Sequence, residues 1–110
     1  MDLFSELTKM QHELDISVKQ LRTSGKDYAT AYTEYRVALA QELVKLRDEG
    51  TPVTLCSDLA RGKREVAEKK FQEISKEAIY KANLESINSL KLRIKIIENQ
   101  IEREWNGTND

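Results

Sequence analysis

The stretch SINSLKLRIKIIENQIEREW, residues 86–105, decides the fold of this chain. Its apolar residues recur at steps of three or four, as they do along one side of an α-helix. The members of this stripe are Ile87, Leu90, Ile94, Ile97, Ile101 and Trp105. The spacing is close to that of a coiled-coil seam and predicts a helix with a partner helix alongside. Leu92 and Ile96 fall on the far side, so the same helix needs more than one neighbour.

A partner helix is predicted at the start of the chain. Over residues 2–22 the apolar positions again have helical spacing, and polar residues fill the other side. These apolar positions are Leu3, Leu7, Met10, Leu14, Val18 and Leu21. One face of this segment is therefore expected to pack along the isoleucine-rich stretch.

The helix either continues through residues 23–27 or stops there and restarts. Gly25 favours a break, because glycine inside a helix costs about 1 kcal/mol relative to alanine. The seven-residue phase of the leucines nevertheless runs on to Tyr28 and Tyr35. We therefore favour one helix over about residues 2–49, with the interrupted helix as the alternative.

Several tyrosines share one face of the second half of this helix. The apolar face consists of Tyr28, Ala31, Tyr32, Tyr35, Ala38, Leu39, Leu43 and Leu46. Tyrosines in such an array could stack on nucleic-acid bases. Packing against another helix is the commoner use of aromatic residues at this spacing and is the interpretation favoured here.

Gly50 and Pro52 predict the end of the first helix, because glycine suits the position after a helix and proline cannot continue it. We expect a packed loop over residues 50–57. Residues 53–55 have extended character, and pairing as a strand, between molecules, is the alternative.

A second long helix is predicted over about residues 58–105, capped by Ser57 or Asp58. Because Gly62 follows after barely one turn, a start at Lys63 is the alternative. Its apolar face is expected to include Val66, Ala67, Phe71, Ile74, Ala78 and Ala82, leading to Ile87. Residues 106–110 are polar and are expected to form a tail beyond the helix.

Two helices of similar length with a short connection predict an all-α, antiparallel, coiled-coil-like hairpin, a single domain over residues 1–110. In this hairpin Leu7 and Leu14 would lie beside Ile94 and Ile101, and Leu43 and Leu46 near Val66. Such a hairpin leaves one side of each helix bare. The bare side is predicted to include Tyr32, Ile79, Leu92 and Ile96, which form a candidate interface for assembly into a multi-helix bundle, a dimer or larger.

Composition narrows the functional classes. The formal net charge of −1 is not that of a typical nucleic-acid-binding protein. The single cysteine excludes an intrachain disulfide and a thiolate metal cluster within one chain. No apolar run approaches the length of a membrane-spanning helix, and no signal peptide is evident. We expect a soluble, cytoplasmic protein without a membrane partner.

No catalytic, cofactor or metal site is predicted. His12 and Glu13 begin a zinc-protease-like motif, but Ile16 stands where the second histidine would be. Cys56 has no histidine expected near it to activate the thiol. Six glutamates alternate with basic residues and are expected on a solvated face; they are Glu68, Glu73, Glu77, Glu98, Glu102 and Glu104. An enzyme is therefore not predicted.

Five basic residues beside the predicted loop form a candidate interaction surface. They are Arg61, Lys63, Arg64, Lys69 and Lys70. This cluster could contact phosphates or an acidic protein surface. Ordinary solubilising charge is the interpretation favoured here.

The runs TPVTL (residues 51–55) and DLARG (residues 58–62), with the ending ENQIEREW (residues 98–105), resemble small helical proteins of phages and prophages of Gram-positive bacteria. This resemblance implies a viral accessory protein in the host cytoplasm, acting on phage DNA metabolism or on a host or phage protein, and it carries no assigned activity. The leading hypothesis is a non-catalytic helical module for self-assembly and protein interaction. The alternative is a nucleic-acid-binding accessory protein that uses the basic cluster.

Overall fold

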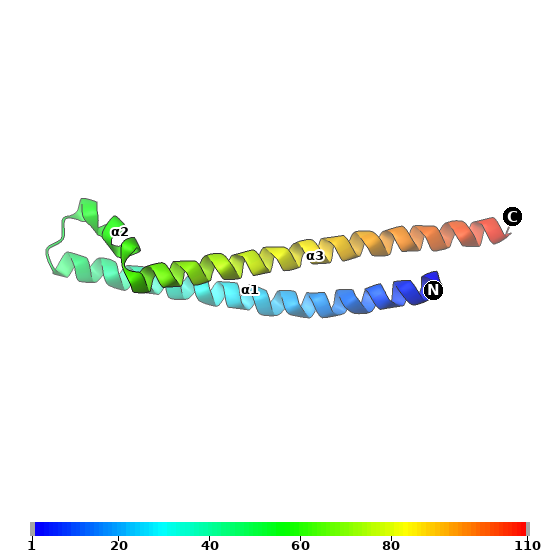
Figure 1. Ribbon diagram of the computed structural model, residues 1–110, viewed down its shortest axis with the longest axis horizontal. Coiled ribbons are helices and arrows are strands. Elements are labelled where there is room, and N and C mark those ends of the chain that lie inside the picture. The colour runs from blue at the N-terminus through cyan, green and yellow to red at the C-terminus, as the bar shows by residue number, and fades with distance from the viewer. Residues whose placement is uncertain (1, 110) are drawn as a thin grey trace. The chain divides into compact units, whose positions relative to one another are not determined.

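The computed structural model describes residues 2–109, with side chains to residue 107. Its helices are α1 (Leu3–Asp48), α2 (Val53–Gly62) and α3 (Arg64–Asn109). Figure 1 shows α1 and α3 as antiparallel partners, with α2 in the connection between them. Residues 2–109 contain no strand. The predicted all-α helical hairpin is confirmed.

The two long helices pack together in two compact units. Unit 1 contains residues 2–23 and 81–109, and unit 2 contains residues 24–80. Each unit therefore holds one part of α1 and one part of α3, and unit 2 also holds α2. Whether residues 1–110 behave as a single domain stays a prediction.

The core of unit 1 consists of leucine, isoleucine and methionine side chains from both helices. Met10, Ile94 and Ile97 are buried at its centre. The partly buried residues around them are Leu3, Leu7, Leu14 and Ile101, as the sequence predicts. Trp105 is 68% exposed, because it lies beside the first turn of α1, in a shallow groove next to Leu3 and Phe4. The stripe of residues 86–105 is thus buried except at its end.

α1 runs without interruption through Gly25, so the favoured prediction of a continuous helix is confirmed. Gly25 lies against the ring of Tyr80 from α3: a Cβ atom built on the glycine would be 3.2 Å from Tyr80 Cε2. Ser24 beside it is only 6% exposed. These two small residues allow α1 and α3 to approach closely, which explains their presence in the middle of a helix.

α1 ends just before Gly50, as predicted. Gly50 has φ of 87°, a conformation that side chains rarely adopt. The Thr51 N–H donates to the Leu46 carbonyl at 3.0 Å, and the Gly50 N–H donates to the Arg47 carbonyl at 3.0 Å. This pair of bonds is a Schellman motif, which satisfies carbonyls that the helix end would leave unpaired.

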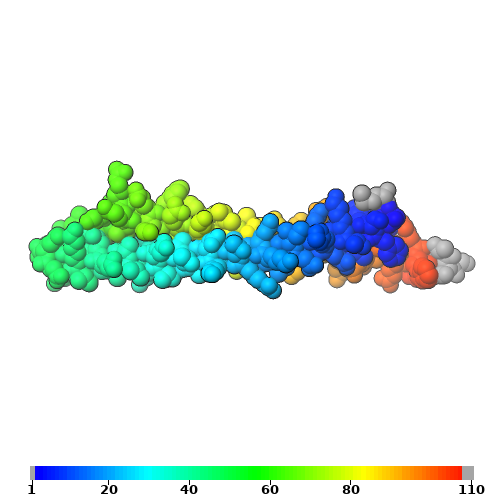
Figure 2. Space-filling model, turned by 90° about the horizontal axis from the view of Figure 1, so that it is seen from below, coloured from blue at the N-terminus to red at the C-terminus, as the bar shows by residue number. Residues whose placement is uncertain are grey.

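The predicted loop over residues 50–57 is too long, because α2 begins at Val53. The alternative of a strand at residues 53–55 is wrong for the same reason. Cys56 and Ala60, four residues apart on α2, are buried, and Ala60 packs in a cluster with Leu39 and Val66. Small side chains on this face let the short helix lie close to its neighbours. In Figure 2 the green atoms of α2 project beyond the cyan surface of α1.

α3 begins at Arg64, so the predicted start near residue 58 is wrong and the alternative start at Lys63 is nearly right. Lys63 is extended, with φ of −67° and ψ of 135°, and its carbonyl accepts the first bond of α3 from the Ala67 N–H. Its ammonium group lies 3.3 Å from the Glu42 carboxylate on α1. This ion pair holds Lys63, the residue between α2 and α3, against α1.

α3 continues to Asn109, so residues 106–109 are helical and the predicted tail is wrong over this range; Asp110 lies outside the described residues. Gly107 does not adopt a positive φ, the conformation with which a glycine would end the helix. Continued helix keeps backbone N–H groups bonded to carbonyls four residues earlier, which offsets the weak propensity of the sequence.

Candidate functional site

In unit 2 the face of α3 that meets α1 is largely polar. It contains Lys70, Glu73 and Glu77, which we call the polar seam. The Lys70 Nζ lies 4.8 Å from the centroid of the Tyr35 ring and 2.9 Å from the Glu73 Oε2. The hydrogen bond with Glu73 raises the pKa of the Lys70 ammonium group above its ordinary value. Glu73 is only 6% exposed, so the prediction of a solvated face is wrong for this residue.

The polar seam continues through contacts with tyrosines. The Tyr28 hydroxyl donates to the Glu77 Oε2 at 3.0 Å. The Tyr28 and Tyr80 rings have centroids 6.0 Å apart and are tilted by 35°. Hydrogen bonds and aromatic contacts therefore hold this part of the helix pair, where unit 1 uses aliphatic side chains.

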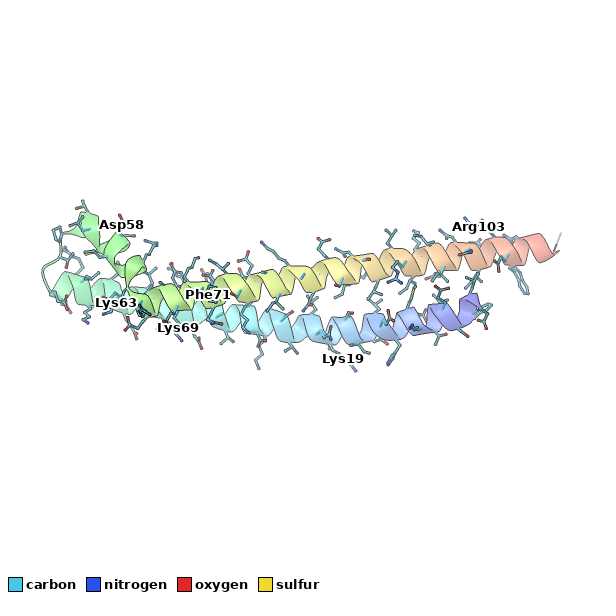
Figure 3. The ribbon with its side chains drawn as sticks, viewed as in Figure 1. Lys19, Asp58, Lys63, Lys69, Phe71 and Arg103 are labelled. Carbon is cyan, nitrogen blue, oxygen red and sulfur yellow. The ribbon has the colours of Figure 1, made fainter. Side chains whose placement is uncertain are left out.

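Most of the predicted apolar face of α3 in unit 2 is exposed to solvent. Phe71 is 65% exposed and Ile74 is 56% exposed, and Ala67 and Ala78 are exposed as well. We call these four residues the outer stripe; Figure 3 labels Phe71 on α3. Ala82, which belongs to unit 1, is also exposed, and Val66 is the buried member of the predicted apolar face in unit 2. Val66 packs near Leu43 and Leu46, as predicted. The outer stripe does not pack within the chain, because Lys70 and Glu73 occupy the side toward α1.

The residues of the predicted oligomer interface are all exposed. Tyr32 and Ile79, in unit 2, are 47% and 50% exposed. Leu92 and Ile96, in unit 1, are 61% and 52% exposed. Their exposure agrees with the predicted bare side of the hairpin, while their role in assembly stays a prediction.

Several residues of the predicted basic cluster have carboxylate partners, and its role as an interaction surface stays a prediction. Lys63 pairs with Glu42, and Lys69 pairs with Glu34 at 3.3 Å, both on α1. Figure 3 labels these two lysines. Arg64 is exposed at the start of α3. Because Lys70 pairs with Glu73, neutralising partners lie beside three of the five predicted cations.

Arg61 and Lys70 lie together in a groove of about 350 Å³ in unit 2. All three helices contribute to what we call the cationic groove, which is lined by Tyr32, Tyr35, Arg36, Arg61, Lys70 and Glu73. Sequence reasoning missed Arg36 as a site residue. Its position four residues after Tyr32 places both side chains on one face of α1, and this spacing could have revealed it.

The structure separates the tyrosines that could have formed a stacking platform. Tyr28 packs with Tyr80, and Tyr35 is buried beneath Lys70. Tyr32 is the member that remains about half exposed. Packing is therefore the role of Tyr28 and Tyr35, as favoured. Of the two tyrosines that line the cationic groove, Tyr32 and Tyr35, Tyr32 is the exposed one.

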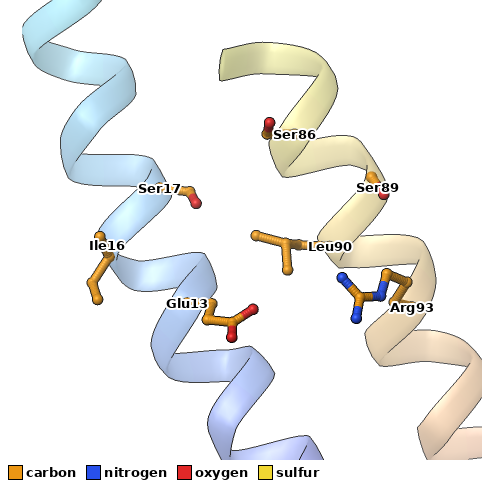
Figure 4. A pocket seen from close by; sticks show the side chains of 7 residues that line it. All are labelled: Glu13, Ile16, Ser17, Ser86, Ser89, Leu90 and Arg93. Carbon is orange, nitrogen blue, oxygen red and sulfur yellow. The ribbon is translucent and has the colours of Figure 1, made fainter. Parts of the chain in front are cut away.

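Unit 1 has a shallow groove of about 370 Å³ between its two helices. Figure 4 shows Leu90 pointing from α3 toward α1, with the Glu13 carboxylate and the Arg93 guanidinium directed toward each other. Two serines of α3, Ser86 and Ser89, complete this side of the groove. Small polar residues explain the hollow here, because they do not fill the space around Leu90.

The residues considered for chemistry belong to different units. His12 is exposed on α1 in unit 1, whereas Cys56 is buried in α2 of unit 2, where its thiol donates to the Pro52 carbonyl at 3.4 Å. Within residues 2–109, no three histidine, cysteine or acidic side chains gather as metal ligands would. Over the same residues, no helix has the length and apolar character to cross a bilayer.

Comparisons with known proteins do not place the chain in a family. No family model, no curated protein and no solved structure matches it.

Proposed function

We propose that this protein is a non-catalytic helical module that assembles with a second copy of itself through the outer stripe. The observation that carries the proposal is the orientation of α3 in unit 2. Glu73, a carboxylate, is turned inward and is 6% exposed, whereas Phe71 is turned outward and is 65% exposed. Burial of apolar surface is the main favourable term in association, so a face of this kind is stabilised by a partner helix.

The outer stripe matches a second copy of itself. Its residues follow the spacing of a coiled-coil seam, with steps of four, three and four, in the order small, large, large, small. A two-fold axis near residues 72–73 would place Ala67 against Ala78 and Phe71 against Ile74 of the second copy. This complementarity is what a closed, isologous dimer interface requires.

Charges beside the stripe favour the antiparallel arrangement. On the heptad set by Phe71 and Ile74, Lys70 and Glu77 take equivalent flanking positions. Both residues lie at the edge between the polar seam and the outer stripe, where they also contact Glu73 and Tyr28 of their own chain. Antiparallel pairing about the two-fold axis would bring Lys70 of one copy next to Glu77 of the other, so opposite charges meet. Parallel pairing would set Lys70 beside Ser75 and lose this attraction.

Assembly of two hairpins would produce a four-helix bundle with surfaces open to further protein partners. Leu92 and Ile96, exposed in unit 1, supply one such surface. The resemblance carried by residues 51–62 and 98–105 supports the proposal that the module is a phage or prophage accessory protein in the host cytoplasm. It acts by presenting helix surfaces rather than by catalysis.

Cysteine crosslinking tests the proposed arrangement in the full chain. In a Cys56→Ala background, chains carrying Ala67→Cys or Ala78→Cys are mixed and mildly oxidised. We expect disulfides mainly between the two different chains, because antiparallel pairing brings positions 67 and 78 together. Gln72→Cys, exposed on the same helix but off the stripe, is the control. Disulfides only between identical chains, or equally fast crosslinking of the control, would contradict the proposal.

A further inference from the structure

The cationic groove has two guanidinium groups in excess of its carboxylate. Lys70 is neutralised by Glu73, at 2.9 Å. Within residues 2–109, no carboxylate lies within ion-pair distance of Arg36 or Arg61. Both arginines line the groove, one from α1 and one from α2. The groove is therefore a place of net positive charge in a chain with a net charge of −1.

Arginine side chains in this arrangement suit an oxyanion. A guanidinium group presents donors in a planar fork that matches two oxygens of a phosphate. The hydroxyl of Ser57 accepts a hydrogen bond from the Arg61 guanidinium one turn away on α2, which orients this side chain. A phosphate in the groove would receive donors from two helices at once.

An aromatic ring borders the same groove. Tyr32 is 47% exposed and precedes Arg36 by one helical turn. An exposed ring next to cations can stack on a nucleobase, and such stacking tolerates any base because every base has a π-face. The volume of about 350 Å³ lies at the lower end of the range of small-ligand sites.

We propose that the cationic groove binds a nucleoside phosphate, with the phosphate on Arg36 and Arg61 and the base on Tyr32. The ligand comes either as a free nucleotide or as a unit of single-stranded nucleic acid. The residues proposed to hold the ligand, Arg36, Arg61 and Tyr32, lie outside the outer stripe, while Lys70 borders both the stripe and the groove.

Binding is measured by fluorescence anisotropy with labelled oligothymidylate and by calorimetry with thymidine 5′-monophosphate, at low and moderate salt. The Arg36→Ala/Arg61→Ala variant is expected to lose about tenfold or more in affinity and to show a shallower salt dependence. Tyr32→Leu is expected to lose roughly tenfold, the size of one stacked base. The charge-matched control Arg64→Ala/Lys69→Ala changes cations outside the groove and is expected to bind like the wild type.

The two ligands distinguish the two sources. Binding of the monophosphate identifies a free nucleotide, whereas binding of the oligonucleotide alone identifies a single strand. The proposal is overturned if neither ligand binds at low salt, or if the groove variant and the control lose affinity equally. It is also overturned if polyglutamate competes as well as oligothymidylate, because the groove would then recognise acidic peptide. Unchanged helical circular dichroism and thermal midpoint show that each variant folds.

Discussion

Gly25 of α1 lies against the ring of Tyr80 of α3, so closely that a Cβ atom on the glycine would be 3.2 Å from the ring. The contact lies in unit 2, where Tyr28 also packs on Tyr80. A glycine that looks like a weak point in the sequence is therefore a point of close helix approach. The contribution of Gly25 to stability therefore depends on the Tyr80 ring.

Gly25→Ala is expected to change the free energy of unfolding of the wild-type chain little or not at all. In an open helix this change stabilises by about 1 kcal/mol, but here the new methyl group must displace the Tyr80 ring. In a Tyr80→Ala background the same change should recover the full gain. Free energies of unfolding from denaturant titration, taken around this double-mutant cycle, measure the coupling.

An equal effect of Gly25→Ala in both backgrounds would mean that the ring and the glycine do not interact. We expect a coupling free energy of about 1 kcal/mol between the two positions, because the contact cancels the preference of a helix for alanine over glycine. Gly107→Ala, which meets no neighbour within 4 Å, reports on helix propensity alone.

Gly50→Ala is expected to destabilise the protein by about 1–2 kcal/mol, because alanine must then adopt the left-handed conformation. The φ of 87° belongs to the Schellman motif that ends α1, and no neighbouring atom would clash with the methyl group. Gly62→Ala is the matched control: it also has open space but no positive φ, and it should be neutral or slightly stabilising. Equal losses for the two variants, measured by urea unfolding, would contradict this assignment.

Lys70→Met is expected to lower the thermal midpoint at pH 7, because it leaves the Glu73 carboxylate buried without its cation. Adding Glu73→Gln should restore much of the loss, since the carboxylate is then gone. A Lys70→Met variant as stable as the wild type would show that the polar seam contributes nothing.

The contribution of Lys70 should also depend on pH. Its pKa is raised above the ordinary value of 10.5, so the pair stabilises the folded state fully below that pH. The stabilisation is lost as the pH rises through the raised pKa. Thermal melts from pH 8 to pH 11 should therefore show the wild type approaching Lys70→Met only at the alkaline end, and a constant difference would contradict the assignment.

The sequence predicted best where apolar periodicity was regular. In unit 1, the stripe that contains Ile94 and Ile97 packs on Met10 and its neighbours, because large aliphatic residues at helical spacing have one way to be buried. Continuous helix through Gly25 was also predicted, from phase alone. The sequence did not reveal why a glycine occupies position 25, because the reason is its contact with Tyr80, which is distant in sequence.

In unit 2 the prediction held for Val66, which packs near Leu43 and Leu46, but the apolar spacing over residues 67–78 follows a face of α3 that is turned away from α1. The outer stripe obeys the helical period as well as any buried stripe, so periodicity alone cannot decide whether its partner is α1 or another molecule. The favoured prediction placed the start of the second long helix near residue 58 and so missed the break at Lys63. The ion pair of Lys63 with Glu42 is a long-range contact that the sequence does not show. Likewise, the cationic groove joins Arg36 and Arg61 from helices that only the fold brings together.

Sedimentation equilibrium over a range of concentrations tests self-assembly through the outer stripe most directly. The wild type is expected to be a dimer or larger species, and Phe71→Glu/Ile74→Glu to be monomeric with its helices intact. Val37→Glu/Val44→Glu, which changes two equally exposed valines on α1, is the control and should remain assembled. A wild-type protein that stays monomeric at every concentration would contradict the central claim.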